Sequence, residues 1–470
     1  MKDLSITQEY LICALNDKGR LSSYNLNLAA CFVGAGLMEL QLEGCISMDQ
    51  KMIKITKELP EEMAYLKPLY EEINAEKAIK IEKVIDNYMI TFTDKALKAL
   101  VQSVKDSLKE SGMMTQVQVG LINKKEEYAP SKEARTAVVE KIRAAAGSER
   151  PLDGFHIIVD AGNGGGGFFV DKVLAPLGAD TAGSQFLEPD GTFPNHIPNP
   201  EDEEAMESIR AAVIANQADL GIIFDTDVDR AGAVDKNGRE INRNRIIALI
   251  SAILLQEHPG TAIVTDSITS SGLKAFIEGK GGIHHRFKRG YKNVINEAVR
   301  LNREGTDCQV AIETSGHGAL KENYFLDDGA YLIAKILIQM ARLKKEGKTI
   351  DGLIADLQEP LEAKELRMKI LAEDFQDYGG RLIEALGEYA KGQPGWQIEP
   401  NNYEGIRVRF DKGEGDGWFL LRLSLHDPII PLNIESNTQG GVKQIAGKLY
   451  PFVAAYEQLD SACLKEEVQG

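Results

Sequence analysis

An aspartate-rich loop within Ala218–Gly232 constrains the fold more than any other stretch of the sequence. The apolar run Leu220–Phe224, flanked by turn-forming residues, predicts a parallel strand buried on both faces. Asp225, Asp227 and Asp229 follow it directly. Carboxylates this close repel one another unless a cation lies among them, so the loop predicts a divalent metal, preferably Mg²⁺, at the carboxyl end of a strand. The alternative is an acidic surface turn.

Composition narrows the class of protein. At 470 residues the chain is too long for one core, and we expect about three or four domains. The formal charge of −17 argues against a nucleic-acid binder, which needs a basic face. Five scattered cysteines favour a reducing compartment. No apolar run approaches the roughly 20 residues of a membrane span, and the N-terminal residues do not form a signal peptide, so we expect a cytoplasmic protein.

Residues 1–146 are expected to form a mostly helical domain without glycine-rich ligand loops. Ser5 and Gln8 have the spacing of a capping box for a first helix. Further helices are predicted at 26–42 and 97–108, and hairpins at 46–55 and 114–130. Helices followed by a hairpin suggest a winged-helix-like end.

Beyond a polar, alanine-rich linker at 131–151, strands alternate with helices, which predicts a parallel sheet. The pattern IIVDAGNGGGG at 157–167 recurs as AIVTDSITSSGL at 262–273. This weak repeat predicts two similar α/β domains, at 147–257 and 258–357. The glycines can cradle phosphate or allow close packing of a strand and a helix, and we favour packing.

The second α/β domain contains two polar loops. The loop at 284–293, HHRFKRGYKN, has four basic side chains: Arg286, Lys288, Arg289 and Lys292. They are equally consistent with neutralising a phosphate and with a solvated basic turn. In ETSGHG at 313–318, small residues flank Glu313, Ser315 and His317, which predicts a sugar-binding or acid/base loop.

The chain becomes α+β at 358–470. Three polar residues alternate in WFLLRLSLHDPIIPLNIES at 418–436: Arg422, Ser424 and His426. In an extended segment they would project to one face and grip a phosphate. The alternative is an edge strand ended by Pro428 and Pro431.

The order DTDVDR, RFKRG, ETSGH and RLSLHDP resembles the α-D-phosphohexomutase family, the phosphomannomutases and phosphoglucomutases, over about residues 147–465. The resemblance implies an isomerase that transfers a phosphoryl group within a hexose phosphate and binds Mg²⁺. It also implies roles for single residues: Asp225, Asp227 and Asp229 as metal ligands, Arg230 beside the reacting phosphate, Lys288 and His317 in acid/base or charge-stabilising roles, Glu313 and Ser315 at the sugar hydroxyls, and Arg422, Ser424 and His426 at the other phosphate. The sequence SLHDPIIPLNIE departs from the commoner SGTEP version, and Tyr291 stands where some relatives have a histidine.

The family's first domain supplies a serine, phosphorylated in the resting enzyme, in a Thr-Ala-Ser-His loop. Here the first histidine is His156, and no Ser-His dipeptide occurs in the sequence. Three explanations, in order of preference, are two reading frames joined near VVEKIRAAAG, a natural fusion that keeps sugar-phosphate binding without mutase chemistry, and a chain that borrows a serine domain from another chain. We therefore expect weak or no mutase activity from the chain alone.

Residues 4–143 resemble the Golgi phosphoprotein family of lipid-binding proteins, in ITQEYLICALNDKGRLSS, AGLMELQLEGCI and LKESGMMTQVQVGLINKKEEYAPSKEA. In eukaryotic relatives a tryptophan and several arginines grip a phosphoinositide headgroup. Tyr24 falls at the tryptophan position, Val33 at an arginine position, and 98–103 at a later arginine pair. The alternative function is therefore a peripheral membrane or scaffold protein, and a structural or oligomerisation role is at least as consistent with these residues.

Overall fold

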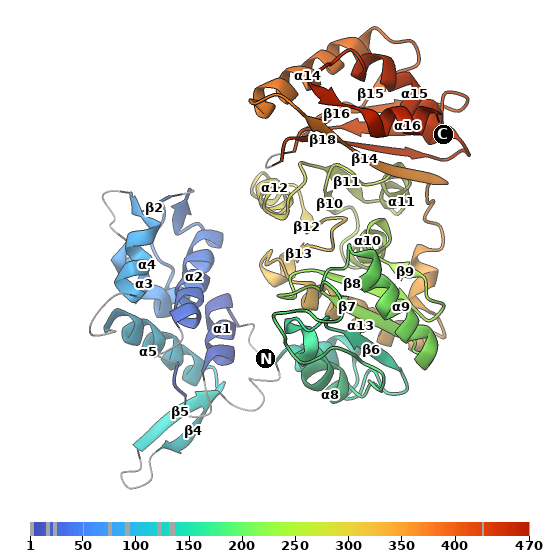
Figure 1. Ribbon diagram of the computed structural model, residues 1–470. Helices are drawn as coiled ribbons and strands as arrows, with labels where there is room; N and C mark the ends of the chain where they lie inside the picture. Colours follow the sequence, from blue (N-terminus) through green and yellow to red (C-terminus); the bar gives the residue numbers. More distant parts are fainter. Residues whose placement is uncertain are drawn as a thin grey trace. The chain divides into compact units, whose positions relative to one another are not determined.

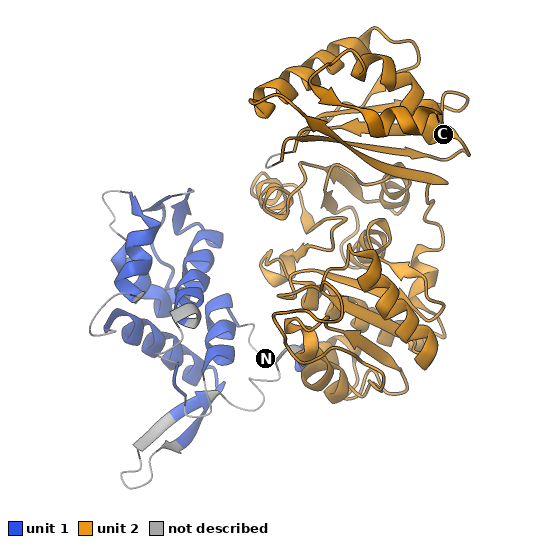
Figure 2. Ribbon diagram, viewed as in Figure 1, with its two compact units in different colours: residues 1–141 blue, residues 142–470 orange. Residues whose placement is uncertain are grey.

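The computed structural model describes residues 4–15, 19–21, 26–49, 51–73, 78–89, 95–119, 125–130, 137–424 and 427–469. The chain divides into two compact units, residues 1–141 and 142–470, which Figure 2 colours separately. Within the described ranges, no helix is both long and apolar enough to cross a membrane.

The first unit is mostly helical. Helix α1 (Ile6–Ala14) begins at the predicted capping box, in which Ser5 Oγ accepts from the Gln8 N–H at 3.3 Å and Gln8 Oε1 accepts from the Ser5 N–H at 3.1 Å. The other elements are α2 (Leu26–Leu42), β1 (Ile46–Met48), β2 (Met52–Ile55), a 3₁₀ turn (Glu61–Leu66), α3 (Lys67–Glu72), β3 (Ile79–Lys80), α4 (Ile81–Met89), α5 (Lys95–Glu110), β4 (Met114–Val119) and β5 (Lys125–Pro130).

Both predicted hairpins of this unit are confirmed, because β1 pairs antiparallel with β2, and β4 with β5. Leu11, Phe32, Leu66 and Leu100 belong to one buried cluster that joins the helices. The winged-helix-like end stays a prediction. Helix α7 (Ala137–Ala146) spans the boundary between the two units.

The second unit opens with a four-stranded sheet of β6 (Ile157–Asp160), β7 (Leu220–Phe224), β8 (Ala231–Asp235) and β9 (Glu240–Ile241). Strands β6 and β7 are parallel, whereas β7 and β8, and β8 and β9, are antiparallel. The expectation of a parallel sheet is therefore wrong in part. The loop 225–230 is too short for a crossover, so the chain returns as a hairpin.

A second four-stranded sheet has the order β11 (Ile283–Arg286), β10 (Ala262–Thr265), β12 (Cys308–Ile312) and β13 (Gly318–Leu320). Strand β10 is parallel to both neighbours, and β13 returns antiparallel to β12. In the first sheet, parallel bridges from β6 to Asp180 and Gln185 place that segment beside β6, as β11 lies beside β10. The two sheets thus follow the same mixed strand order.

Helices cover these sheets. They are α8 (Ala175–Leu177), α9 (Glu203–Asn216), α10 (Asn244–Glu257), α11 (Ser271–Gly279), α12 (Tyr291–Arg303) and α13 (Gly329–Lys345), with 3₁₀ or π turns at Gly165–Gly167, Val170–Leu174, Lys321–Asn323 and Ile350–Ile354. The five residues of β7 are all buried, as the apolar sequence predicts.

The C-terminal sheet has the order β15 (Gln397–Ile398), β16 (Ile406–Phe410), β17 (Gly417–Leu421), β18 (Ile429–Ser436), β14 (Glu362–Ile370) and β19 (Leu459–Asp460). Helices α14 (Phe375–Lys391), α15 (Gly441–Val453) and α16 (Ala462–Gln469) cover one face (Figure 1), where the buried core includes Leu386, Phe419 and Ile445.

The loop predicted to grip a phosphate continues the pairing with β18 where the structure describes it. Strand β17 ends at Leu421, but the Arg422 N–H donates to the Pro431 carbonyl at 3.2 Å and the Ser424 N–H to the Ile429 carbonyl at 3.1 Å. The alternative of an edge strand is wrong, because β18 is interior and Pro431 pairs with Arg367 of β14. Pro431 has no N–H to donate back to Arg422.

Candidate functional site

The metal loop, residues 225–230, connects β7 to β8 and contains the three predicted ligands. Carboxylate oxygens of Asp225, Asp227 and Asp229 lie within 4.8 Å of one another. Asp225 is buried, Asp229 is half-buried and Asp227 is exposed, so the cluster opens toward solvent. A donor set of carboxylate oxygens fits the preference of Mg²⁺.

Arg230 neutralises the innermost carboxylate. Its Nε donates to Asp225 Oδ2 at 3.0 Å, and its backbone N–H donates to Oδ1 at 3.1 Å. Its Nη1 donates to Asn199 Oδ1 at 3.2 Å. The guanidinium group is thus fixed beside the ligands while 23% of the side chain stays exposed.

The surroundings of Asp229 affect its charge. Burial, a hydrogen bond with Asp225 and repulsion from Asp225 and Asp327 raise the pKa of Asp229 to about 7, against the opposing effect of His317. A bound cation would favour the ionised form, so the acidic loop and a metal stabilise each other.

The backbone of the metal loop is strained. Val228 has a φ of 72°, which is costly for a β-branched residue. Its carbonyl accepts from the Gly329 N–H at 3.0 Å, where α13 begins. A Cβ on Gly329 would lie 2.6 Å from the carbonyl carbon of Arg230, so this approach requires glycine. Strain of this kind concentrates at functional sites.

The glycine-rich loop after β6 packs against the metal loop. The Gly165 N–H donates to the Thr226 carbonyl at 2.8 Å. A Cβ on Gly166 would lie 2.8 Å from the ring of Phe224, and one on Gly167 only 2.0 Å from the Leu187 carbonyl oxygen. These contacts support the packing role that we expected for the glycines.

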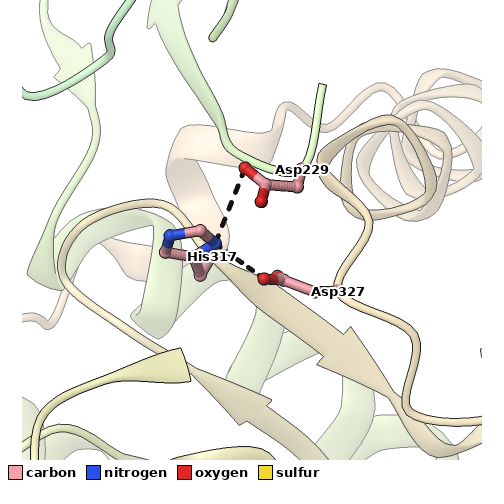
Figure 3. Close-up of side chains that lie close together, drawn as sticks. All are labelled: Asp229, His317 and Asp327. Carbon is pink, nitrogen blue, oxygen red and sulfur yellow. Dashed lines mark ion pairs between the residues drawn. The ribbon is translucent and has the colours of Figure 1, made fainter. Parts of the chain in front are cut away.

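His317 lies between two carboxylates from different segments (Figure 3). Its Nδ1 is 2.7 Å from Asp327 Oδ2 and 3.7 Å from Asp229 Oδ1. Its ring stacks on Tyr291, with 5.0 Å between centroids. Burial alone would lower the pKa of His317, but contact with Asp327 and the charges of Asp229 and Glu313 raise it. His317 is therefore placed to hold a proton beside the metal loop.

Backbone bonds join the metal loop to the ETSGH loop. The Ala231 N–H donates to the Gly316 carbonyl at 3.3 Å, and Arg230 and His317 form an isolated antiparallel bridge. The Glu313 N–H donates to the His317 carbonyl at 2.9 Å. The structure therefore brings together the predicted residues Asp229, Arg230 and His317.

Glu313 and Ser315 are buried at the same junction. Glu313 Oε1 accepts from the Gly290 N–H at 2.6 Å, and Oε2 accepts from Ser315 Oγ at 3.4 Å. Burial and the nearby Asp266 raise the pKa of Glu313 to about 7, despite the opposing effects of Gly290, Arg289 and His317.

Glu313→Gln is expected to stabilise the protein at pH 8. The folded-state pKa of Glu313, about 7, lies above the ordinary value of 4.5. The ionised carboxylate therefore destabilises the folded state, and this cost grows as the pH rises from 4.5 to 7. The amide removes that cost, at most about 3 kcal/mol. Thermal denaturation should show a melting temperature several degrees higher at pH 8 and no difference near pH 4.5. Glu373→Gln, at an exposed position, is the control; an equal shift there would contradict the assignment.

Of the three residues of the C-terminal domain that we predicted to bind a phosphate, the structure describes two, and their contacts differ. Arg422 Nη1 donates to Glu404 Oε1 at 3.3 Å, and only 11% of the side chain is exposed. Ser424 Oγ accepts from the Asp427 N–H at 3.3 Å and so closes the turn. His426 lies outside the described residues.

In the basic loop after β11, two arginines are held by other residues and one lysine is exposed. Arg286 is held by the Ser270 carbonyl at 2.9 Å, and Arg289 by Glu201 at 3.3 Å, so neither is a free solvated cation. Lys288 is exposed, and its side chain has no hydrogen bond or ion pair with any described residue. The contacts of the described residues therefore do not bring Lys288 to His317.

Sequence reasoning missed Asp327 and Glu404. Glu404 Oε2 accepts from Ser267 Oγ and from the Arg289 N–H, both at 2.8 Å, and so links the second sheet to Arg422. The acidic pair in FLDDG at 325–329, shortly after the ETSGH loop, could have indicated Asp327. Glu404 had no such signal.

The site of this α/β protein combines an acidic loop from one mixed sheet with an imidazole from the loop of the next. Two family models match this region: phosphoglucomutase/phosphomannomutase α/β/α domain II over residues 136–238, and domain III of the same family over residues 242–361. Residues 136–361 are therefore similar to domains II and III of the phosphoglucomutase/phosphomannomutase family. A Golgi phosphoprotein 3 (GPP34) model matches residues 6–182, so the two kinds of match overlap over 136–182.

Curated relatives include a phosphoglucomutase of Neisseria gonorrhoeae, 32% identical over 301 residues, covering 64% of this chain and 61% of the relative. A phosphomannomutase/phosphoglucomutase of Pseudomonas syringae pv. tomato is 31% identical, covering 62% of this chain and 58% of the relative. The chain thus spans about six-tenths of the length of these relatives.

Solved structures share the fold. A phosphoglucomutase/phosphomannomutase family protein of Burkholderia thailandensis is 24% identical, with a TM-score of 0.57 over 76% of this chain and 69% of that one. Parafusin, a phosphoglucomutase of Paramecium, is 13% identical, with a TM-score of 0.53 over 80% of this chain and 72% of that one.

Proposed function

We propose that residues 142–470 bind a hexose phosphate together with Mg²⁺, through three phosphohexomutase domains at 147–257, 258–357 and 358–470. The observation that carries the proposal is the backbone junction between the metal loop and the ETSGH loop, with the Ala231 N–H 3.3 Å from the Gly316 oxygen. It supports a single site in which a cation and sugar-binding side chains act together.

Each side chain has a defined part in this proposal. Asp225, Asp227 and Asp229 hold Mg²⁺, which when bound neutralises the charge of a reacting phosphate. Arg230, fixed by Asp225, adds a guanidinium group to the same phosphate. His317, positioned by Asp327 at 2.7 Å, holds a proton for a sugar hydroxyl.

The sugar and the distal phosphate are assigned to the remaining residues. Glu313 and Ser315 orient the sugar hydroxyls, and Arg422, Ser424 and His426 receive the non-reacting phosphate. Because Arg422 is paired with Glu404, the phosphate must compete with that carboxylate. Lys288 is an acid/base or charge-stabilising group only if the loop after β11 moves toward the site.

Phosphoryl transfer also needs a group that carries the phosphoryl between positions. No Ser-His dipeptide occurs in these 470 residues. We therefore propose a phosphohexomutase-type protein, an isomerase by family, that binds its substrate and is weak or inactive without a serine domain from outside these 470 residues.

Arg422→Gln tests the binding site directly. Calorimetric titration with mannose 1-phosphate and glucose 1-phosphate in Mg²⁺ should show affinity reduced by about 10- to 100-fold, because a charge-assisted contact is lost. Arg381→Gln, on the exposed face of α14, is the matched control and should bind like the parent. Undetectable binding by the parent protein, or equal affinity in both variants, would contradict the proposal.

A second candidate, lipid binding by the first unit, rests on the GPP34 match over residues 6–182. Against it, Val33, at the expected arginine position, is fully buried. Tyr24 lies outside the described residues. We expect equal sedimentation of the protein with phosphoinositide vesicles and with neutral vesicles at physiological salt. Preferential binding to the phosphoinositide vesicles would favour a peripheral membrane protein.

A further inference from the structure

A cleft of about 930 Å³ lies between two walls of the second unit. One wall comprises residues between 199 and 245 together with Arg289, and the other comprises residues 359–367 and 418–435. Among the described residues that line it, the metal ligands and the sugar residues Glu313 and Ser315 do not occur, and neither does Arg422. The cleft borders the site proposed above, since Thr314, between those two sugar residues, also lines it, but it contains none of those binding residues; it is large enough for a small organic ligand.

One wall of the cleft is positively charged, whereas the chain as a whole is negatively charged. The whole sequence has a formal charge of −17. On the first wall, however, five arginines stand with only two glutamates among the described lining residues, whereas the second wall has two basic and three acidic residues. Positive charge is thus concentrated on one wall, where it attracts an anion.

The arginines of this wall are incompletely neutralised. Arg245 is nine-tenths buried; its Nη1 lies 3.4 Å from Glu359 Oε2, but its Nε has no hydrogen-bond partner among the described residues. Arg239 pairs with the same Glu359 carboxylate. The Glu359 carboxylate contacts both guanidinium groups, with the charge of Asp351 also nearby, and the buried Nε–H of Arg245 is left for a ligand.

Arg243 adds a third guanidinium group at a strained position. Its backbone has φ 50° and ψ −126°, and Asn242 holds it by accepting from its N–H at 2.8 Å. No described residue forms a hydrogen bond or ion pair with its exposed side chain. Helix α10 starts directly after it and has no side-chain cap.

The opposite wall offers acceptors. Asn433 Nδ2 donates to Glu365 Oε2 at 3.1 Å, while its Oδ1 is buried without a hydrogen-bond partner among the described residues. Such a wall suits the hydroxyl or amino donors of an organic group. A molecule with anionic charge at one end and donors at the other matches both walls.

We propose that this cleft binds an organic oligophosphate, with a chain of two or more phosphate groups along Arg239, Arg243 and Arg245 and its polar organic end against Asn433. The bound molecule would join the β9–α10 segment to the C-terminal sheet. It would hold these two parts of the second unit together. The first part also carries the metal loop, and the second also carries Arg422.

The test uses the full chain without Mg²⁺, in EDTA, titrated calorimetrically with inorganic tripolyphosphate and with ATP. Both are expected to bind. Arg243→Gly and Arg243→Gln should each weaken binding at least about tenfold, because an unpaired guanidinium group is lost. Arg243→Gly should also melt no lower than the parent, since glycine adopts this backbone without strain. Loss of binding is then separable from unfolding.

Two controls separate this site from others. Arg303→Gln, exposed and outside the cleft, should leave tripolyphosphate binding unchanged. Arg422→Gln, which tests the proposed hexose-phosphate site, should leave in place the binding event that the Arg243 variants weaken. No binding by the parent protein, binding by an Arg243 variant as tight as that of the parent, or the same loss in Arg422→Gln would overturn the inference.

Discussion

Asp227→Ala is expected to lower the affinity of the protein for Mg²⁺ by about 100-fold, because the loop loses one of its three carboxylates. Asp227 is exposed, so the substitution should cost little stability. Calorimetric titration with Mg²⁺, or Mn²⁺ binding followed by electron paramagnetic resonance, measures the change.

Asp171→Ala removes an exposed carboxylate outside the loop and should bind Mg²⁺ like the parent. Equal losses in the two variants would indicate only a general electrostatic effect of a chain with a charge of −17. Unchanged affinity in Asp227→Ala would leave the acidic surface turn as the better interpretation of the loop.

The second large effect concerns turnover. With mannose 1-phosphate or glucose 1-phosphate, Mg²⁺ and a hexose bisphosphate activator, the chain alone should isomerise its substrate at least about 10⁴-fold more slowly than the full-length Pseudomonas syringae relative. Removing a nucleophile that forms a covalent intermediate commonly costs that much or more. A coupled assay that follows product formation measures the ratio.

Asp227→Ala is the control in that assay as well. Turnover within about 100-fold of the relative, abolished by Asp227→Ala, would show that the chain contains a nucleophile other than a Ser-His loop. Phosphopeptide mapping of the protein after reaction would then locate it. Residual turnover that Asp227→Ala leaves unchanged would come from a contaminating enzyme.

The parts of the site that could be predicted from the sequence are those that depend on a local pattern of residues. An apolar run followed by alternating aspartates specifies a buried strand and its loop, and the structure has both in β7 and residues 225–230. The ETSGH loop likewise follows a strand, β12. The antiparallel return of β8 could also have been predicted, because the loop before it is too short for a crossover. The alternation of strands and helices suggested a parallel sheet instead.

Contacts between distant segments could not be predicted. Glu404 meets Ser267, 137 positions earlier, and Arg289 meets Glu201, 88 positions earlier. A single acidic residue in a polar segment gives no sign of such a partner, because its pairing depends on how whole sheets pack. The strained φ of Val228 is hidden for the same reason, since the Gly329 contact that holds it comes from the start of another helix.

The bond between the Ala231 N–H and the Gly316 carbonyl has a consequence for how this protein can change over generations. Main-chain atoms are present whatever side chain a mutation introduces. Replacements at positions 230 and 317 can therefore alter charge, proton affinity and ligand preference while the two loops keep their spacing. New specificities can arise here one side chain at a time, without a rearrangement of the scaffold.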